Sequence, residues 1–64
     1  MIEHLCGDLI RSEADSVVVR VNGIGFQAEV PTNSFADAQV GDSITVLTSL
    51  VFRQDGFALF GFKS

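Results

Sequence analysis

Arg53, Gln54 and Asp55 are three neighbouring side chains whose types can engage a charged ligand. The Arg53 guanidinium can contact a phosphate or pair with Asp55 or with a neighbouring subunit, and the Gln54 amide can hydrogen-bond a base edge or a phosphate. A plainer interpretation is open for each residue. Arg53 and Gln54 can be exposed residues at the end of a strand, and Asp55 before Gly56 is ordinary turn chemistry.

The rest of the chain offers no catalytic constellation. His4 and Cys6 would share one face of a strand, but no nucleophile motif accompanies them. Gly23 and Gly25 do not open a helix, so they do not form a phosphate-binding loop. The eight acidic residues are scattered, without a candidate acid and base pair. The sequence therefore predicts a domain that is not an enzyme by itself and that uses no metal and no cofactor.

Two apolar, β-prone runs, residues 47–53 and 57–62, flank Gln54, Asp55 and Gly56, which we call the acidic tip. They predict the two strands of a closing hairpin, joined by residues 54–56. An earlier run, residues 2–10, predicts a strand with a bulge or a close backbone approach at Gly7. The tip is therefore expected to be carried on two stiff strands at the end of a largely β chain.

Two more strands are expected between these segments. Residues 17–21 are dense in β-branched valine, with alternate valines on one face. The Asn-Gly pair at residues 22–23 predicts a tight turn. From Phe26 the residues alternate between a buried and a solvated face until Pro31, which cannot donate to a ladder. After Asp42 the chain returns to a strand, the fourth, which continues into residues 47–53 of the closing hairpin.

Residues 32–38 are the only helix candidate, about two turns long and docked on the sheet through Phe35. Five strands with a short helix between the third and fourth predict an all-β fold, a Greek-key OB-fold barrel. Because a barrel needs all its strands, residues 1–64 are predicted to be one OB-fold domain. The six phenylalanines are expected mostly at core-facing positions, which leaves no aromatic platform for stacking bases.

The charge balance argues against independent binding of nucleic acid. The chain has 64 residues, four Lys or Arg and a net charge of −4, whereas nucleic-acid binding normally draws on a basic patch. OB-folds bind ligands across strands 2 and 3 and the loops that join strands 1 to 2 and 4 to 5. Here both loops, residues 12–15 and 54–56, are acidic, and Glu29 adds a third charge. Single-strand binding in the usual OB-fold mode is therefore disfavoured.

The compartment expected for the chain is the cytoplasm. One cysteine permits no internal disulfide, which fits a reducing environment. No run of about 18 apolar residues is present for a membrane span, and the first residues do not resemble a signal peptide.

Three separated blocks of the sequence resemble the N-terminal domain of the RuvA family of bacterial Holliday junction proteins. The resemblance spans the whole chain without an obvious gap. It rests on Met1-Ile2 with Leu5 and Gly7, on residues 21–26 with Val30-Pro31 and Phe35, and on Arg53-Gln54-Asp55 with Leu59, Gly61 and Phe62.

The resemblance implies a DNA-binding and assembly domain that helps build a homotetramer on four-way junction DNA during branch migration in recombination and repair. It also implies two further domains, one that holds DNA through helix-hairpin-helix motifs and one that binds the RuvB ATPase. The last hairpin tip would lie at the tetramer centre as an acidic pin. The family usually has two consecutive carboxylates there, and Gln54 replaces the first, so Asp55 would carry the pin alone.

An alternative function remains open at this point. The acidic surface also suits a protein-interaction OB module that makes no direct contact with nucleic acid. A tight protein partner, with no contact between the hairpin and DNA, would distinguish this module from the acidic pin.

Overall fold

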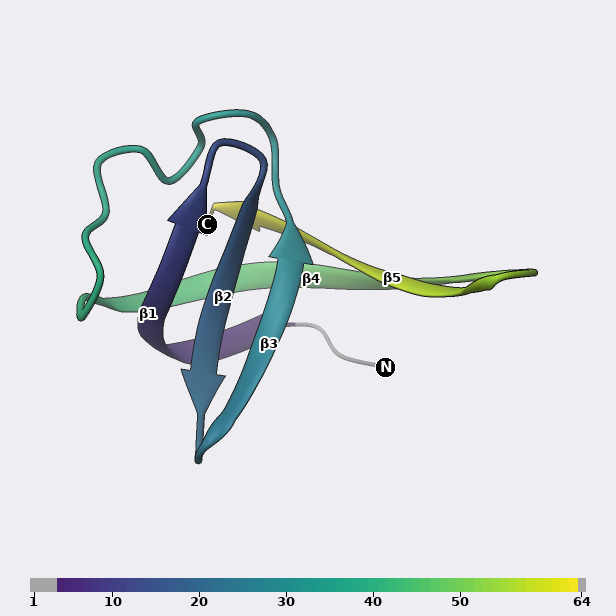
Figure 1. Cartoon of the computed structure of the whole chain (residues 1–64), viewed down its shortest axis with the longest axis horizontal. Helices are drawn as coiled ribbons and strands as arrows, with labels where there is room; N and C mark the ends of the chain where they lie inside the picture. The colour runs from purple at the N-terminus through teal and green to yellow at the C-terminus, as the bar shows by residue number, and fades with distance from the viewer. Residues whose placement is uncertain (1–3, 64) are drawn as a thin grey trace.

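The computed structural model describes residues 4–63, and these form a five-stranded closed barrel (Figure 1). The strands are β1 (His4–Glu13), β2 (Ser16–Val21), β3 (Ile24–Glu29), β4 (Ser43–Arg53) and β5 (Gly56–Lys63). Their order around the barrel is β1-β2-β3-β5-β4, and β4 closes the ring by pairing with β1. Only the β3–β5 pair is parallel. The all-β OB-fold predicted from the sequence is confirmed.

Alternating side chains of the strands fill the barrel. Val17 and Val19 on β2 are almost fully buried, whereas the next residue, Arg20, is exposed. Ala28 of β3 and Val46 of β4 are also completely buried. These residues pack in one cluster because successive side chains of a strand point to opposite faces.

The first two hairpins turn tightly. Asn22 and Gly23 have φ angles of 51° and 81°, the left-handed pair that a two-residue turn of the primed type requires. Val21 pairs directly with Ile24, so β3 begins two residues earlier than the alternation from Phe26 indicated. The β1–β2 hairpin turns at residues 14–15, because β1 continues through a segment that looks like a polar loop in the sequence.

Gly7 lies at a close backbone approach, but the bulge predicted there is elsewhere. A Cβ at Gly7 would collide with the Arg20 carbonyl oxygen and lie 3.1 Å from the Val19 side chain. The register of β1 on β2 shifts between Leu9 and Arg11. Gly7 therefore has to lack a side chain, but it is not the bulge. The extra residue of the bulge lies between Leu9 and Arg11. Residues 2–3 of the predicted first strand lie outside the described residues.

The predicted helix between the third and fourth strands is wrong. Residues 32–37 form turns whose backbone hydrogen bonds span three residues, as from Ala36 N–H to the Asn33 carbonyl. Asn33 has a φ of 60°, which leaves the right-handed helical path, and its N–H donates to the Ala14 carbonyl of the β1–β2 turn. A two-turn helix has little stability of its own to resist this contact. Phe35 is nevertheless buried, as expected of a docked segment.

Within residues 4–63 no helix is long and apolar enough to cross a membrane.

The expectation that most phenylalanines face the core is also wrong. Phe35 is buried, but Phe52 and Phe57 are 72% and 71% exposed and Phe62 is 49% exposed. The pattern of alternation is present in these strands, but β4 and β5 extend past the barrel, where no other strand covers their faces (Figure 1).

Candidate functional site

The outer part of the β4–β5 hairpin projects from the barrel as an arm, residues 50–59. Along the arm β4 and β5 pair only with each other, from Leu50 opposite Leu59 to Arg53 opposite Gly56. Residues 51–57 are all exposed. The arm lies along the longest axis of the molecule, which measures 34 Å against 26 and 19 Å for the others (Figure 1). A feature predicted as a simple hairpin is thus a two-stranded ribbon held away from the core.

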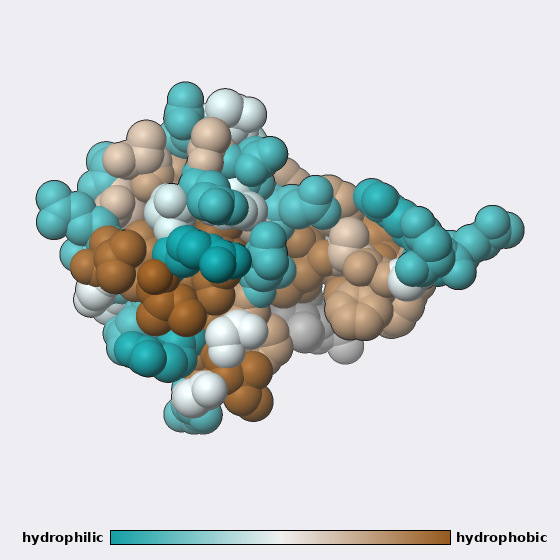
Figure 2. Space-filling model, in the orientation of Figure 1, coloured by the Kyte–Doolittle hydropathy of each residue, from teal (hydrophilic) through white to brown (hydrophobic). Residues whose placement is uncertain are grey.

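The tip of the arm consists of Gln54 and Asp55, one residue fewer than the predicted connection. Gly56 already pairs with Arg53 as the first residue of β5, and it has the φ of 137° that suits glycine. Both tip side chains are exposed, and neither makes a hydrogen bond or ion pair within residues 4–63. Hydrophilic residues cover the end of the arm in Figure 2. The Asp55 carboxylate is therefore free to act on whatever approaches the tip.

Arg53 does not neutralise the tip. Its guanidinium carbon lies 5.6 Å from the centre of the Phe60 ring, so the side chain reaches back along the arm toward the barrel. This cation–π contact lies on the face that residues 51 and 58 share. Of the roles that the sequence leaves open for Arg53, pairing with Asp55 in the same chain is not seen. The adjacent guanidinium thus leaves the negative charge of Asp55 uncompensated.

Phe52 and Phe57 form a ring pair that sequence reasoning missed. They are opposite each other in the hairpin register, with ring centroids 6.4 Å apart and planes inclined by 57°. This tilted arrangement suits aromatic quadrupoles, although both rings stay largely exposed. Counting outward from the observed tip at Gln54-Asp55 places these rings opposite each other, whereas the three-residue connection expected from the sequence would pair Phe52 with Ala58. Their exposure depends on the absence of a covering strand and is not encoded in the alternation.

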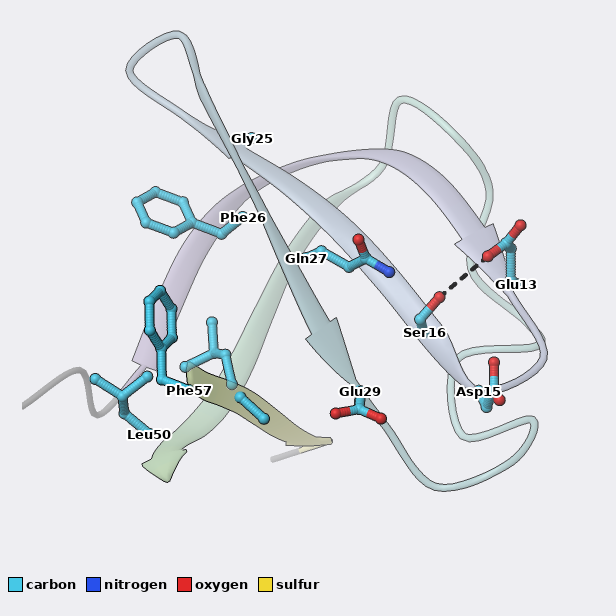
Figure 3. Close-up of a pocket in the computed structure, with 11 residues that line it drawn as sticks. Glu13, Asp15, Ser16, Gly25, Phe26, Gln27, Glu29, Leu50 and Phe57 are labelled. Atoms are coloured by element: carbon cyan, nitrogen blue, oxygen red, sulfur yellow. Dashed lines mark hydrogen bonds between the residues drawn. The ribbon is translucent and has the colours of Figure 1, made fainter. Parts of the chain in front are cut away.

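A groove of about 820 Å³ separates the arm from the barrel wall formed by β3. Figure 3 shows the Phe26 and Phe57 rings and Leu50 toward one end, while carboxylates gather toward the other. The acidic side chains are those of Glu13, Asp15 and Glu29. They are the carboxylates expected on the ligand-binding face of an OB-fold, so the structure brings together charges that are far apart in the sequence.

The other candidate residues form no reactive centre. Cys6 is exposed, and its thiol lies 3.0 Å from the Thr45 hydroxyl on β4. His4 occupies the same strand face two residues away but makes no hydrogen bond to Cys6. Among residues 4–63, no group of three or more His, Cys, Asp or Glu side chains is arranged to hold a metal ion.

A small closed β-barrel with an exposed, acid-tipped arm defines this chain as an OB-fold domain built for contacts outside its own core. Residues 1–61 match the family described as RuvA N terminal domain, and the chain belongs to that family. The resemblance seen in the sequence is therefore confirmed.

Curated relatives carry the name Holliday junction branch migration complex subunit RuvA. The relative from Acinetobacter baumannii (strain SDF) is 39% identical over 63 residues, which cover 98% of this chain and 32% of the relative. The relative from Neisseria meningitidis serogroup C is 38% identical over 65 residues, covering 100% of this chain and 34% of the relative. The chain thus spans about a third of the length of these relatives.

Proposed function

We propose that this chain is the N-terminal, non-catalytic DNA-handling and assembly domain of a bacterial cytoplasmic RuvA-type protein. In this proposal the complete protein forms a homotetramer on four-way junction DNA and works in recombination and repair. Further domains hold the DNA backbone and bind the RuvB ATPase. Family membership over residues 1–61 and the name that the relatives share support the proposal.

The single observation that carries the proposal is the exposed Asp55 at the end of an arm that projects away from the barrel. One carboxylate about 8 Å from a phosphate in water repels it by only about 0.5 kcal/mol, and salt weakens this further. Four tips near one axis, shielded from water by DNA, would together reach a few kcal/mol, which is the scale of unstacking a base step. The pin therefore acts only in the assembly.

The composition of the arm supports a role in assembly as well. Phe52 and Phe57 are exposed on one face of it, and on the opposite face Val51 is followed toward the barrel by Leu47 and Phe62. Figure 2 shows apolar residues directly behind the hydrophilic end of the arm. Contiguous exposed apolar surface marks contact sites between proteins. A second copy of the same domain is the partner that the proposed tetramer supplies.

The test is junction binding by the longer parent protein in which this domain would operate. The parent should bind a four-way junction well above a linear duplex of the same length, while the 64-residue chain binds both weakly because its net charge is −4. Equal binding of junction and duplex by the parent would overturn the proposal.

Asp55→Asn in the parent tests the pin separately. The variant should keep its stability and change strand separation or junction binding, whereas Asp8→Asn removes an equal charge from the barrel surface and should act as wild type. If Asp55→Asn and Asp8→Asn behave alike, Asp55 is only a turn residue.

The acid-lined groove favours a second candidate function, a protein-interaction module without direct contact to nucleic acid. Photo-crosslinkers placed at Gln54 in the parent assembly distinguish the two. Crosslinks from Gln54 to DNA would support the pin, and crosslinks only to protein would support the module.

A further inference from the structure

The walls of the groove between β3 and β5 are two strand edges that have almost no partner in the sheet. β3 pairs with β2 along its whole length, but it meets β5 only where Glu29 is opposite Phe60. From that point the two strands diverge, because β5 follows the arm (Figure 1). Alternate backbone groups of residues 24–28 and 56–59 therefore face the groove rather than another strand. Unpaired edges of this kind are templates for an added strand.

The side chains of the groove are divided by chemistry along its length. Phe26, Phe57 and Leu59 supply apolar surface, and Gln27 lies between this surface and the carboxylates (Figure 3). At the acidic end, Glu13 accepts a hydrogen bond from the Ser16 hydroxyl at 3.2 Å, which holds its carboxylate in place. Among the described residues that line the groove there is no Lys or Arg. A ligand that fits must therefore combine apolar side chains with positive charge.

We propose that this groove binds an extended segment of a protein partner, rich in basic and β-branched residues, as an added strand beside β3. Main-chain hydrogen bonds to the open edge hold the segment, with its apolar side chains toward the phenylalanine end of the groove and its basic side chains toward the carboxylates. The proposal does not depend on junction binding, because it uses the barrel side of the arm and leaves the tip free.

The charges of the groove favour this ligand over the two main competitors. Nucleic acid would bring phosphates against Glu13, Asp15 and Glu29 without a cation among the lining residues to receive them. A second copy of the chain also carries a net charge of −4. Of its four cations, Lys63 is paired with Asp37 and Arg53 lies over Phe60, which leaves Arg11 and Arg20 exposed without such a contact within residues 4–63. Neither competitor supplies free positive charge as readily as a basic peptide.

The test uses the 64-residue chain and a short labelled peptide with valine in one half and arginine in the other. We expect saturable binding by fluorescence anisotropy, with amide shift changes in NMR spectra centred on residues 24–28 and 57–59. The matched peptide with glutamate in place of arginine should not bind. The arginine peptide methylated on alternate backbone nitrogens should bind much more weakly, because it cannot complete the ladder.

Glu29→Gln should weaken binding of the arginine peptide about two- to fivefold, the effect of one partly exposed charge. Asp8→Asn, which makes the same change in net charge away from the groove, should leave binding unchanged. Circular dichroism would confirm that both variants keep the barrel.

Three results would overturn the proposal. The first is equal binding of the arginine and glutamate peptides. The second is shift changes at residues 24–28 caused by a thymine oligonucleotide and not by the arginine peptide. The third is a concentration-dependent self-association that buries the same residues and excludes the peptide, which would assign the groove to a second copy.

Discussion

At the scale of single residues, Asp55 can act at the tip because its neighbours leave its charge intact. Arg53 is the cation nearest in sequence, and it is engaged with Phe60 toward the barrel. Gln54 adds a polar side chain without charge. One carboxylate per tip repels a phosphate only weakly in water, so the total repulsion depends on how many tips lie together. The pin role proposed for Asp55 therefore requires an assembly that brings several tips together.

Gly61 is a glycine whose replacement by alanine should disturb the packing inside the barrel. A Cβ there would lie 2.5 Å from Val46 Cγ1 and 3.2 Å from the Ala28 Cβ, inside the packed core. Gly61→Ala should therefore lower the free energy of unfolding by about 1–3 kcal/mol through overpacking. Urea denaturation followed by circular dichroism measures the change.

Gly25→Ala is the matched control for this prediction. Its added Cβ would make ordinary contacts, 3.4 Å to Val18 Cγ1 and 3.5 Å to Ile10 Cδ1, and Gly25 is likewise in a strand. It should leave stability unchanged or raise it slightly, because alanine loses less backbone entropy on folding. Equal destabilisation by both variants would show that the contacts of Gly61 are not the cause.

The Lys63–Asp37 pair gives a pH-dependent signal at the end of β5. The hydrogen bond from the Lys63 ammonium, 3.2 Å from Asp37 Oδ1, is the main reason that the pKa of Asp37 lies below its ordinary value of 3.8. A carboxyl with a depressed folded-state pKa stabilises the fold above its unfolded-state pKa, and this contribution is lost as pH falls through the folded value. Both side chains are exposed, so the contribution is small.

Lys63→Met should raise the pKa of Asp37 toward 3.8, as measured by NMR titration of its carboxyl carbon. Lys63→Arg keeps a cation at this position and should keep the pKa depressed. The same low pKa in the Met variant would assign the shift to the backbone hydrogen bond of Asp37, which is the second cause.

At the scale of elements, the arm and the barrel differ in what stabilises them. The barrel part of β4 pairs with β1 on one side and β5 on the other, as at Val46, which is also completely buried. Beyond Leu50 the two strands of the arm have only each other. An isolated two-stranded hairpin is marginally stable in water. The arm should therefore open locally, and its amides should exchange with solvent faster than those of the barrel.

The ring pair of Phe52 and Phe57 is a side-chain contact that joins the two strands of the arm. Phe52→Ala and Phe57→Ala should each reduce amide protection in residues 50–59, with a coupling of about 0.5–1 kcal/mol in a double-mutant cycle. Global unfolding by urea should change little, because both rings are more than two-thirds exposed. Additive effects of the two substitutions on exchange would mean that the rings do not support each other.

The elements that sequence reasoning identified well are those whose pattern is local. The alternate valines of β2 and the Asn22-Gly23 turn identify themselves within a few residues, because strand period and positive φ are properties of neighbours. The prediction of a helix at residues 32–38 was wrong because the backbone there depends on a residue distant in sequence: the Asn33 N–H donates a hydrogen bond to the Ala14 carbonyl. The groove also could not be predicted, because it depends on where β5 leaves β3.

At the scale of the whole molecule, the exposed apolar surface of the arm and the net charge of −4 oppose each other in any association of copies. Burial of Phe52 and its neighbours favours association in proportion to the apolar area removed from water. Repulsion between like-charged copies opposes it and is screened over about 8 Å at physiological salt. Self-association of the 64-residue chain should therefore strengthen as salt is raised.

Sedimentation velocity over a concentration series, at low and high salt, measures this balance. Phe52→Ser should weaken association, because it removes a ring that is 72% exposed on the arm. Val40→Ser is the matched control, since Val40 is 68% exposed but precedes β4 at a distance in sequence from the arm. If salt dissociates the copies, ion pairs rather than the apolar arm hold them together, because screening weakens attraction between opposite charges as it weakens repulsion between like ones.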